Sequence, residues 1–135
     1  NPINFSNPRV DMMKVAFAGP ASNLMLAFLS GLIIRLINTF DIMTSDSMDL
    51  IITYFMFINI MLAVFNMIPI APLDGSQIFG SIISKYNSEL AWKLQMYGPK
   101  ILLGLILFGI VTKFSILGLI MKPFINLFMY LFAGL

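Results

Sequence analysis

The chain has 135 residues, of which 59% are hydrophobic and only 10% charged, and it contains neither histidine nor cysteine. A soluble domain is typically about 25% charged, so this composition predicts an integral membrane protein with a single membrane domain, residues 1–135. The missing residue types exclude a disulfide framework, a thiol nucleophile and a Ser-His-Asp triad. The basic residues are scattered singly and the net charge is +2, which gives no indication of nucleic-acid binding.

The first membrane span is predicted over residues 12–38. Twenty consecutive positions within it carry no charge, and at about 1.5 Å rise per residue they cover the roughly 30 Å of a hydrocarbon core. Asp11 suits the start of this helix, and Arg35 can extend its charge toward the interface. Gly19-Pro20 predicts a kink, because proline removes a backbone hydrogen bond.

The second span is predicted over residues 50–70, after a polar, acidic loop at 41–49. Pro69 and Pro72 argue against helix in the last part of this apolar run. A short helix capped by Asp74 is expected to follow them.

The third span is predicted over residues 100–121, and from residue 101 onward Lys113 is its one charged residue. The polar segment 85–100 before it reads as a surface connection with some helix. The apolar segment 123–134 is too short to cross alone, so we expect a short helix on the surface or packed on the bundle. The fold class is therefore all-α: a polytopic membrane helix bundle of about three transmembrane helices plus short interfacial helices.

Loop charges predict the orientation of these spans. The N-terminal segment and the connection after the second span are basic, whereas the first loop carries three aspartates. Basic loops stay in the cytoplasm. Asp74 is therefore expected near the cytoplasmic end of the second span.

Asp74 is the leading candidate site residue, because an ionisable group at membrane depth is costly and is usually functional. Its structural alternative is a turn or helix cap, since Asp-Gly is a strong turn signal. The functional alternative is a ligand or proton-handling carboxylate on a proline-stiffened segment. Asn66 lies within the preceding apolar run. Its amide either forms a hydrogen bond between two helices or belongs to the site. A run of small residues precedes Asn23 and allows another helix to approach closely. Close packing explains this segment as readily as a direct role of Asn23 in a site.

Two motifs are specific enough to suggest a family. They read Asn66-x-x-Pro69-x-x-Pro72-Leu73-Asp74-Gly75 and, upstream of it, Ala18-Gly19-Pro20-x-x-Asn23. Together they resemble the site-2 protease family of intramembrane zinc metalloproteases. The opening residues 1–12 and Tyr97-Gly98 are also similar to that family, whereas Ser76 stands where many members have a second glycine.

The resemblance implies a zinc metalloendopeptidase that cleaves transmembrane helices of membrane proteins within the lipid bilayer. It implies that Asp74 is the third zinc ligand and that Asn66 positions the substrate carbonyl. Asn23 would have a supporting role. The small size suggests a multi-pass protein of a bacterial or archaeal plasma membrane.

One departure from the family is severe. Its other two zinc ligands and its general base lie on a His-Glu-x-x-His helix before the segment that opens this chain, which has no histidine. A catalytic zinc needs about three protein ligands, so we expect the chain alone to be inactive and to require an N-terminal segment of the same protein. Two alternatives stay open: a non-catalytic relative that binds or assembles with membrane helices, and an ion or proton transporter subunit that uses Asp74.

Overall fold

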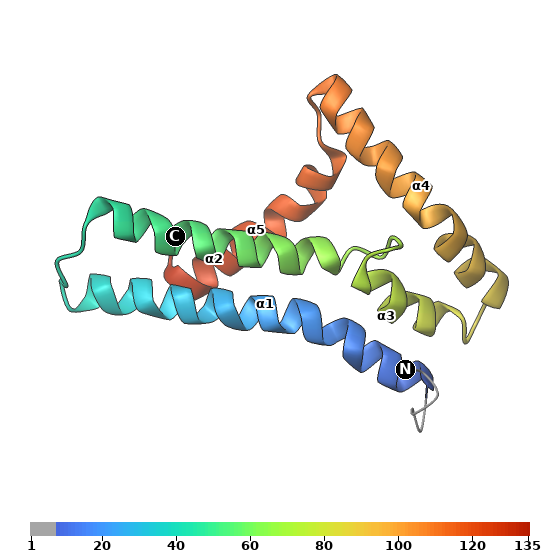
Figure 1. Ribbon diagram of the computed structural model, residues 1–135, viewed down its shortest axis with the longest axis horizontal. Coiled ribbons are helices and arrows are strands. Elements are labelled where there is room, and N and C mark those ends of the chain that lie inside the picture. The colour runs from blue at the N-terminus through green and yellow to red at the C-terminus, as the bar shows by residue number, and fades with distance from the viewer. Residues whose placement is uncertain (1–7) are drawn as a thin grey trace.

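The computed structural model describes residues 8–135, with side chains from residue 11 onward, so the opening motif at residues 1–7 lies outside the described part. The described residues form five helices and no strand, which confirms the all-α class (Figure 1). The helices are α1 (Pro8–Thr39), α2 (Asp46–Asn66), α3 (Asp74–Ile83), α4 (Ser88–Thr112) and α5 (Ile116–Ala133). Four of them, all except α3, are long and apolar enough to cross a membrane.

The predicted third span at 100–121 is wrong, because the chain breaks in the middle of it. Lys113 ends α4 in the left-handed conformation, with φ 57°. Ser115 then starts α5, its hydroxyl oxygen accepting a hydrogen bond from the backbone N–H of Gly118 at 2.9 Å. The predicted short helix 123–134 is the second half of α5. Hydropathy alone does not show this break, because the residues on both sides of it are apolar.

The predicted surface connection at 85–100 is mostly the first half of α4. Asn87 caps that helix by accepting a hydrogen bond from Leu90 N–H at 2.9 Å. A long apolar helix therefore begins among polar residues. The described residues thus contain four candidate spans instead of about three.

Helices α1 and α2 form a long hairpin (Figure 1). Helix α1 continues through Pro20. Helix α2 ends at Asn66, before Pro69 and Pro72, as these two prolines predict. The loop between the two helices is shorter than predicted, because Ser45 caps α2 and the acidic residues Asp46 and Asp49 occupy its first turn. Acidic side chains are favourable there, at the positive end of the helix dipole.

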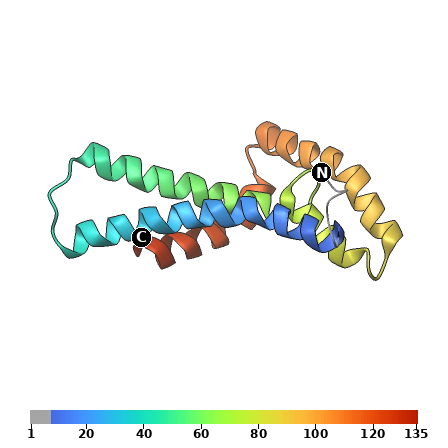
Figure 2. The same ribbon diagram turned by 60° about the horizontal axis from the view of Figure 1, so that its bottom comes forward.

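Helix α5 returns along this hairpin and packs on both of its helices (Figures 1 and 2). The core that the three helices share is made of small and medium side chains, namely Ala27, Ile34, Met56, Ile60 and Ala133. At the end of α5, Arg35 donates hydrogen bonds to the backbone carbonyls of Phe132 at 2.8 Å and Leu131 at 3.0 Å. The arginine predicted to extend to the interface thus closes the C-terminus of another helix.

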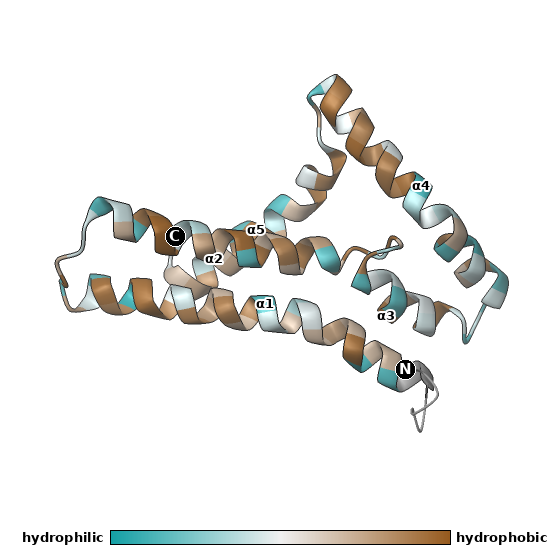
Figure 3. Ribbon diagram, viewed as in Figure 1, coloured by the Kyte–Doolittle hydropathy of each residue, from teal (hydrophilic) through white to brown (hydrophobic). Residues whose placement is uncertain are grey.

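Helices α3 and α4 lie at the other end of the hairpin. Short α3 packs on α1, and α4 runs away from the bundle before the chain turns back into α5 (Figure 1). Polar residues gather on α3 and on the first turns of α4, whereas the rest of α4 is apolar (Figure 3). This end of the hairpin holds the candidate site.

Candidate functional site

The segment 67–73 turns the chain sharply between α2 and α3. Its backbone closes two tight turns, with Ile70 N–H donating to Ile68 O at 2.8 Å and Leu73 N–H donating to Ile70 O at 3.0 Å. A Cβ on Gly75 would lie 2.5 Å from the carbonyl oxygen of Ile68 and would also meet Met67 O. The first turn of α3 therefore packs directly on the backbone of this corner, and only glycine fits at position 75.

Asp74 is the first residue of α3 and not its cap, so the predicted capping role is wrong. The cap position belongs to Leu73, which makes no side-chain capping bond, and its carbonyl oxygen accepts the Ser76 hydroxyl at 2.7 Å. The Asp74 side chain is half-buried. Its carboxylate is consequently available for another role.

The Asp74 carboxylate lies against α1. Its Oδ2 atom is 3.0 Å from the place that a Cβ on Gly19 would occupy. Glycine at position 19 thus leaves the space that the carboxylate fills. The structure brings together the two motifs that the sequence singled out, although they lie on different helices.

Asn23 and Asn66 are placed on the same two helices that form this end of the hairpin. Asn23 follows Gly19 by four residues on α1, hence on the same helix face. Asn66 is the last residue of α2, at the start of the corner. Both side chains are half-buried.

The polar side chains of Asn23, Asn66 and Asp74 make no hydrogen bond or ion pair with any residue that the structure describes. None of their unpaired atoms is fully buried either. They are therefore accessible to a ligand or to water. Asn59 differs, because its amide donates to Phe55 O within α2 at 2.8 Å and does not join two helices as a buried asparagine often does.

The residues of this chain do not by themselves fit a zinc centre. Within residues 11–135 no group of three histidine, cysteine, aspartate or glutamate side chains lies close enough together to hold a metal ion. A catalytic zinc takes about three protein ligands and one open position. Asp74 can supply one of those ligands, and the others have to come from elsewhere.

Two features of the site were not predicted from the sequence. The first is the close contact between α4 and the corner 67–73. A Cβ on Gly98 would lie 2.7 Å from both the backbone nitrogen and the Cβ of Ala71. The Gly98-Pro99 pair was the available signal, since a glycine inside a helix often marks a close backbone approach. Helix α4 is thereby attached next to the segment that carries Asp74.

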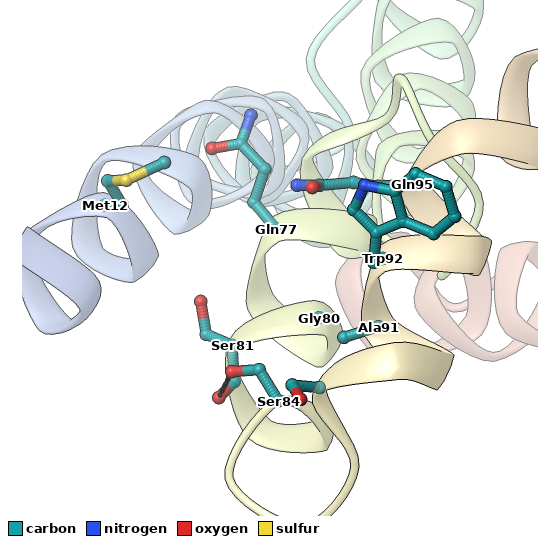
Figure 4. Close-up of a pocket in the computed structure, with 9 residues that line it drawn as sticks. Met12, Gln77, Gly80, Ser81, Ser84, Ala91, Trp92 and Gln95 are labelled. Carbon is teal, nitrogen blue, oxygen red and sulfur yellow. Dashed lines mark hydrogen bonds between the residues drawn. The ribbon is translucent and has the colours of Figure 1, made fainter.

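The second unpredicted feature is a cavity of about 300 Å³ between α3 and α4 (Figure 4). Its polar lining comes from both helices, with Met12 of α1 beside it. The available signal was the polar residues of α3 at helical spacing, namely Gln77, Ser81 and Ser84.

Comparisons with known proteins agree with the motifs. The model of a family described as "Peptidase family M50" matches residues 33–109. "Putative zinc metalloprotease YwhC" of Bacillus subtilis (strain 168) is 29% identical over 104 residues, which are 72% of this chain and 48% of that protein. "Zinc metalloprotease MJ0392" of Methanocaldococcus jannaschii is 29% identical over 125 residues, which are 91% of this chain and 34% of that protein. No solved structure matches.

This chain thus spans about half of one relative's length and a third of the other's. The family model covers more than half of the chain, and four of its helices are suited to spanning a membrane. The chain is an integral membrane protein that belongs to peptidase family M50, the family of site-2-protease-type zinc metalloproteases.

Proposed function

We propose that this chain forms one side of the active site of an intramembrane zinc metalloprotease that cleaves transmembrane helices. The observation that carries the proposal is the position of the Asp74 carboxylate, in contact with α1 at Gly19 and without a partner among the described residues. A half-buried carboxylate in an apolar bundle calls for a functional partner. Membership of the peptidase family supports a metal as that partner.

In this proposal Asp74 contributes one carboxylate oxygen to the zinc ion. The remaining ligands come from a His-Glu-x-x-His helix in another part of the same protein. The limited coverage of both relatives agrees with a longer protein. The corner 67–73 keeps Asp74 in place through contacts between backbone atoms, which do not vary with side-chain rotamer.

The two asparagines have supporting roles in the proposal. The Asn66 carboxamide can donate a hydrogen bond to the carbonyl oxygen of the scissile peptide, where negative charge develops during hydrolysis. Asn23, on the face of α1 that carries Gly19, is a further donor near the substrate. A helical peptide bond is shielded by its own backbone hydrogen bonds, so the substrate has to unwind locally before these groups reach it.

Replacement of Asp74 tests the proposal in the full-length protein. We expect Asp74→Asn to lower cleavage of a single-pass transmembrane reporter in proteoliposomes by about a hundredfold or more, and to reduce bound zinc, because a metal ligand is lost. Asp46→Asn, an exposed aspartate in the first turn of α2, is the matched control and should leave both quantities unchanged. Normal zinc content and cleavage in Asp74→Asn would refute the proposal.

A smaller substitution tests whether the contact with position 19 positions the Asp74 carboxylate. Gly19→Ala places a methyl group 3.0 Å from Asp74 Oδ2, so the carboxylate has to shift by a few tenths of an ångström. Displacements of about 1 Å cost enzymes on the order of a hundredfold, so we expect roughly a tenfold loss of cleavage with the fold intact. Unchanged activity in Gly19→Ala would mean that this contact does not position the carboxylate.

A non-catalytic, helix-binding relative is the second candidate. The observation in its favour is that the described residues include no three-ligand group. Stoichiometric zinc in the full-length protein would exclude it, whereas a co-purifying transmembrane helix that stays intact, without zinc, would support it.

A further inference from the structure

The cavity between α3 and α4 is lined by polar side chains that point into one space. We call the surface formed by Gln77, Ser81, Ser84, Trp92 and Gln95 the polar groove. Figure 4 shows Gln77 and Gln95 reaching into the groove from α3 and α4, with Met12 on the facing wall. Its volume of about 300 Å³ is at the lower end of the roughly 300–1,000 Å³ of ligand sites.

The hydrogen-bonding groups of the polar groove are mostly unused. Ser84 donates its hydroxyl to Ser81 O at 3.0 Å. The amides of Gln77 and Gln95 and the indole N–H of Trp92, by contrast, have no partner among the described residues. Each glutamine amide carries both donors and an acceptor, as a peptide group does.

The lining of the polar groove contains no charged side chain. A phosphate or carboxylate ligand is ordinarily held by arginine or lysine. The groove therefore matches an uncharged ligand that donates and accepts hydrogen bonds along its length. A peptide main chain has this chemistry.

The polar groove begins next to the candidate site. Gln77, Ser81 and Ser84 follow Asp74 by three, seven and ten residues, so they lie on one face of α3 and of its C-cap residue, Ser84. At about 1.5 Å per helical residue these offsets correspond to about 5–15 Å, which an extended chain covers in about one to five residues. A peptide with its scissile bond at Asp74 would have residues about one to five positions away inside the groove.

We propose that the polar groove binds an extended, uncharged segment of the substrate, located about one to five residues from the bond that is cleaved. This proposal rests on the proposed function and adds a binding subsite to it. Unwinding a transmembrane helix frees backbone N–H and C=O groups, which are costly at membrane depth unless new partners are found. The groove supplies such partners at the required distance from Asp74.

Photo-crosslinking tests the proposal through binding alone. A photoreactive phenylalanine analogue replaces Trp92 in the full-length Asp74→Asn variant, in which the bound peptide stays intact. The probe is a synthetic peptide with an apolar span of about twenty residues followed by a helix-breaking Ser-Asn-Gly segment. The control peptide has an Ala-Leu helix in place of that segment. The same analogue at Phe108, an exposed aromatic residue further along α4, reports background contact.

We expect crosslinks from position 92 to the helix-breaking segment, at a yield well above that from position 108 and above that for the helical peptide. Gln77→Leu with Gln95→Leu should weaken peptide binding about tenfold, because two amide contacts are lost. Asn38→Leu, an exposed amide at the other end of α1, should leave binding unchanged.

Equal yields from positions 92 and 108, or binding that the double leucine variant does not alter, would overturn the proposal. Crosslinks to lipid alone would assign the polar groove to a lipid headgroup and would also overturn it. Because the measurement involves no cleavage, its result is separate from the test of Asp74 as a metal ligand. If the wild-type protein cleaves its substrate although the groove binds no peptide, the proposed function still stands.

Discussion

The half of the molecule formed by α1, α2 and α5 is closely packed, whereas α3 and α4 leave much of their surface open. Met56 and Ile60 are fully buried between α1, α2 and α5. In the apolar window of α4 only 11% of the residues are buried, against 28% in α1. Figures 2 and 3 show the contrast between the hairpin with α5 beside it and the separate α4.

The difference follows from the way helices associate in lipid. Lipid tails are as apolar as leucine, so membrane helices pack through small residues and hydrogen bonds more than through the hydrophobic effect. The packed half supplies such contacts at Gly31, whose Cβ position is only 2.7 Å from Phe132 Cβ, and at Arg35. Helix α4 makes a comparable contact at Gly98. Its large side chains, such as Val111 at 81% exposed, are free to face lipid.

The largest expected effect in this comparison comes from adding a methyl group to each half. Gly31→Ala would place Cβ within 2.8 Å of the backbone of Phe132, so we expect a loss of about 3 kcal/mol in the free energy of unfolding. Gly104→Ala on α4 meets no atom within 4 Å and should stabilise the helix by about 0.5–1 kcal/mol. Denaturant titration in micelles measures both values. Equal effects of the two substitutions would show that α4 is packed as closely as α1 and α5.

A smaller effect is expected from the arginine that closes α5. Arg35→Met removes hydrogen bonds to three carbonyl oxygens, those of Tyr130, Leu131 and Phe132, and a cation at a helix C-terminus. We expect a loss of about 1–2 kcal/mol, which the same titration detects. Lys122→Met, an exposed cation on α5, is the control and should change stability little. Equal free energies of unfolding for the two variants would show that the Arg35 hydrogen bonds do not stabilise the packed half.

The smallest effect is expected inside the polar groove. Gly80 lies in α3 between the groove residues, and a Cβ there would meet no atom within 4 Å. Gly80→Ala should therefore stabilise the protein by at most about 1 kcal/mol, as in an exposed helix. Thermal unfolding of the variant checks this value. Clear destabilisation would show that α3 and α4 close on each other more tightly than the structure indicates.

Several features of the site were predictable because they depend on local chemistry. Pro69 and Pro72 argue against helix, and α2 does end before them, at Asn66, although the predicted span ran to residue 70. Asp74 attracted attention as a carboxylate next to an apolar run. Its contact with Gly19 was not predicted from spacing; the resemblance placed both residues in family motifs, and the structure shows that they meet.

Other features depend on contacts between distant residues, and for these the predictions were incomplete or wrong. The break at Lys113 lies between two apolar runs, so hydropathy merged parts of α4 and α5 into one span. Asp74 was expected to cap α3 because Asp-Gly favours a turn. In the structure the helix begins at Asp74, where its first turn packs on the corner at Gly75.

The sequence by itself determined that this protein is an all-α membrane protein, that its second span ends near a pair of prolines, and which carboxylate is the candidate site residue. These properties follow from hydropathy, from the missing N–H of proline and from the cost of charge in lipid. Only the tertiary structure decided that Asp74 lies against Gly19, that α4 rests on Ala71 through Gly98, and that a polar groove opens beside the site. Those arrangements depend on how closely backbones approach, which is a property of pairs of helices and not of any one segment.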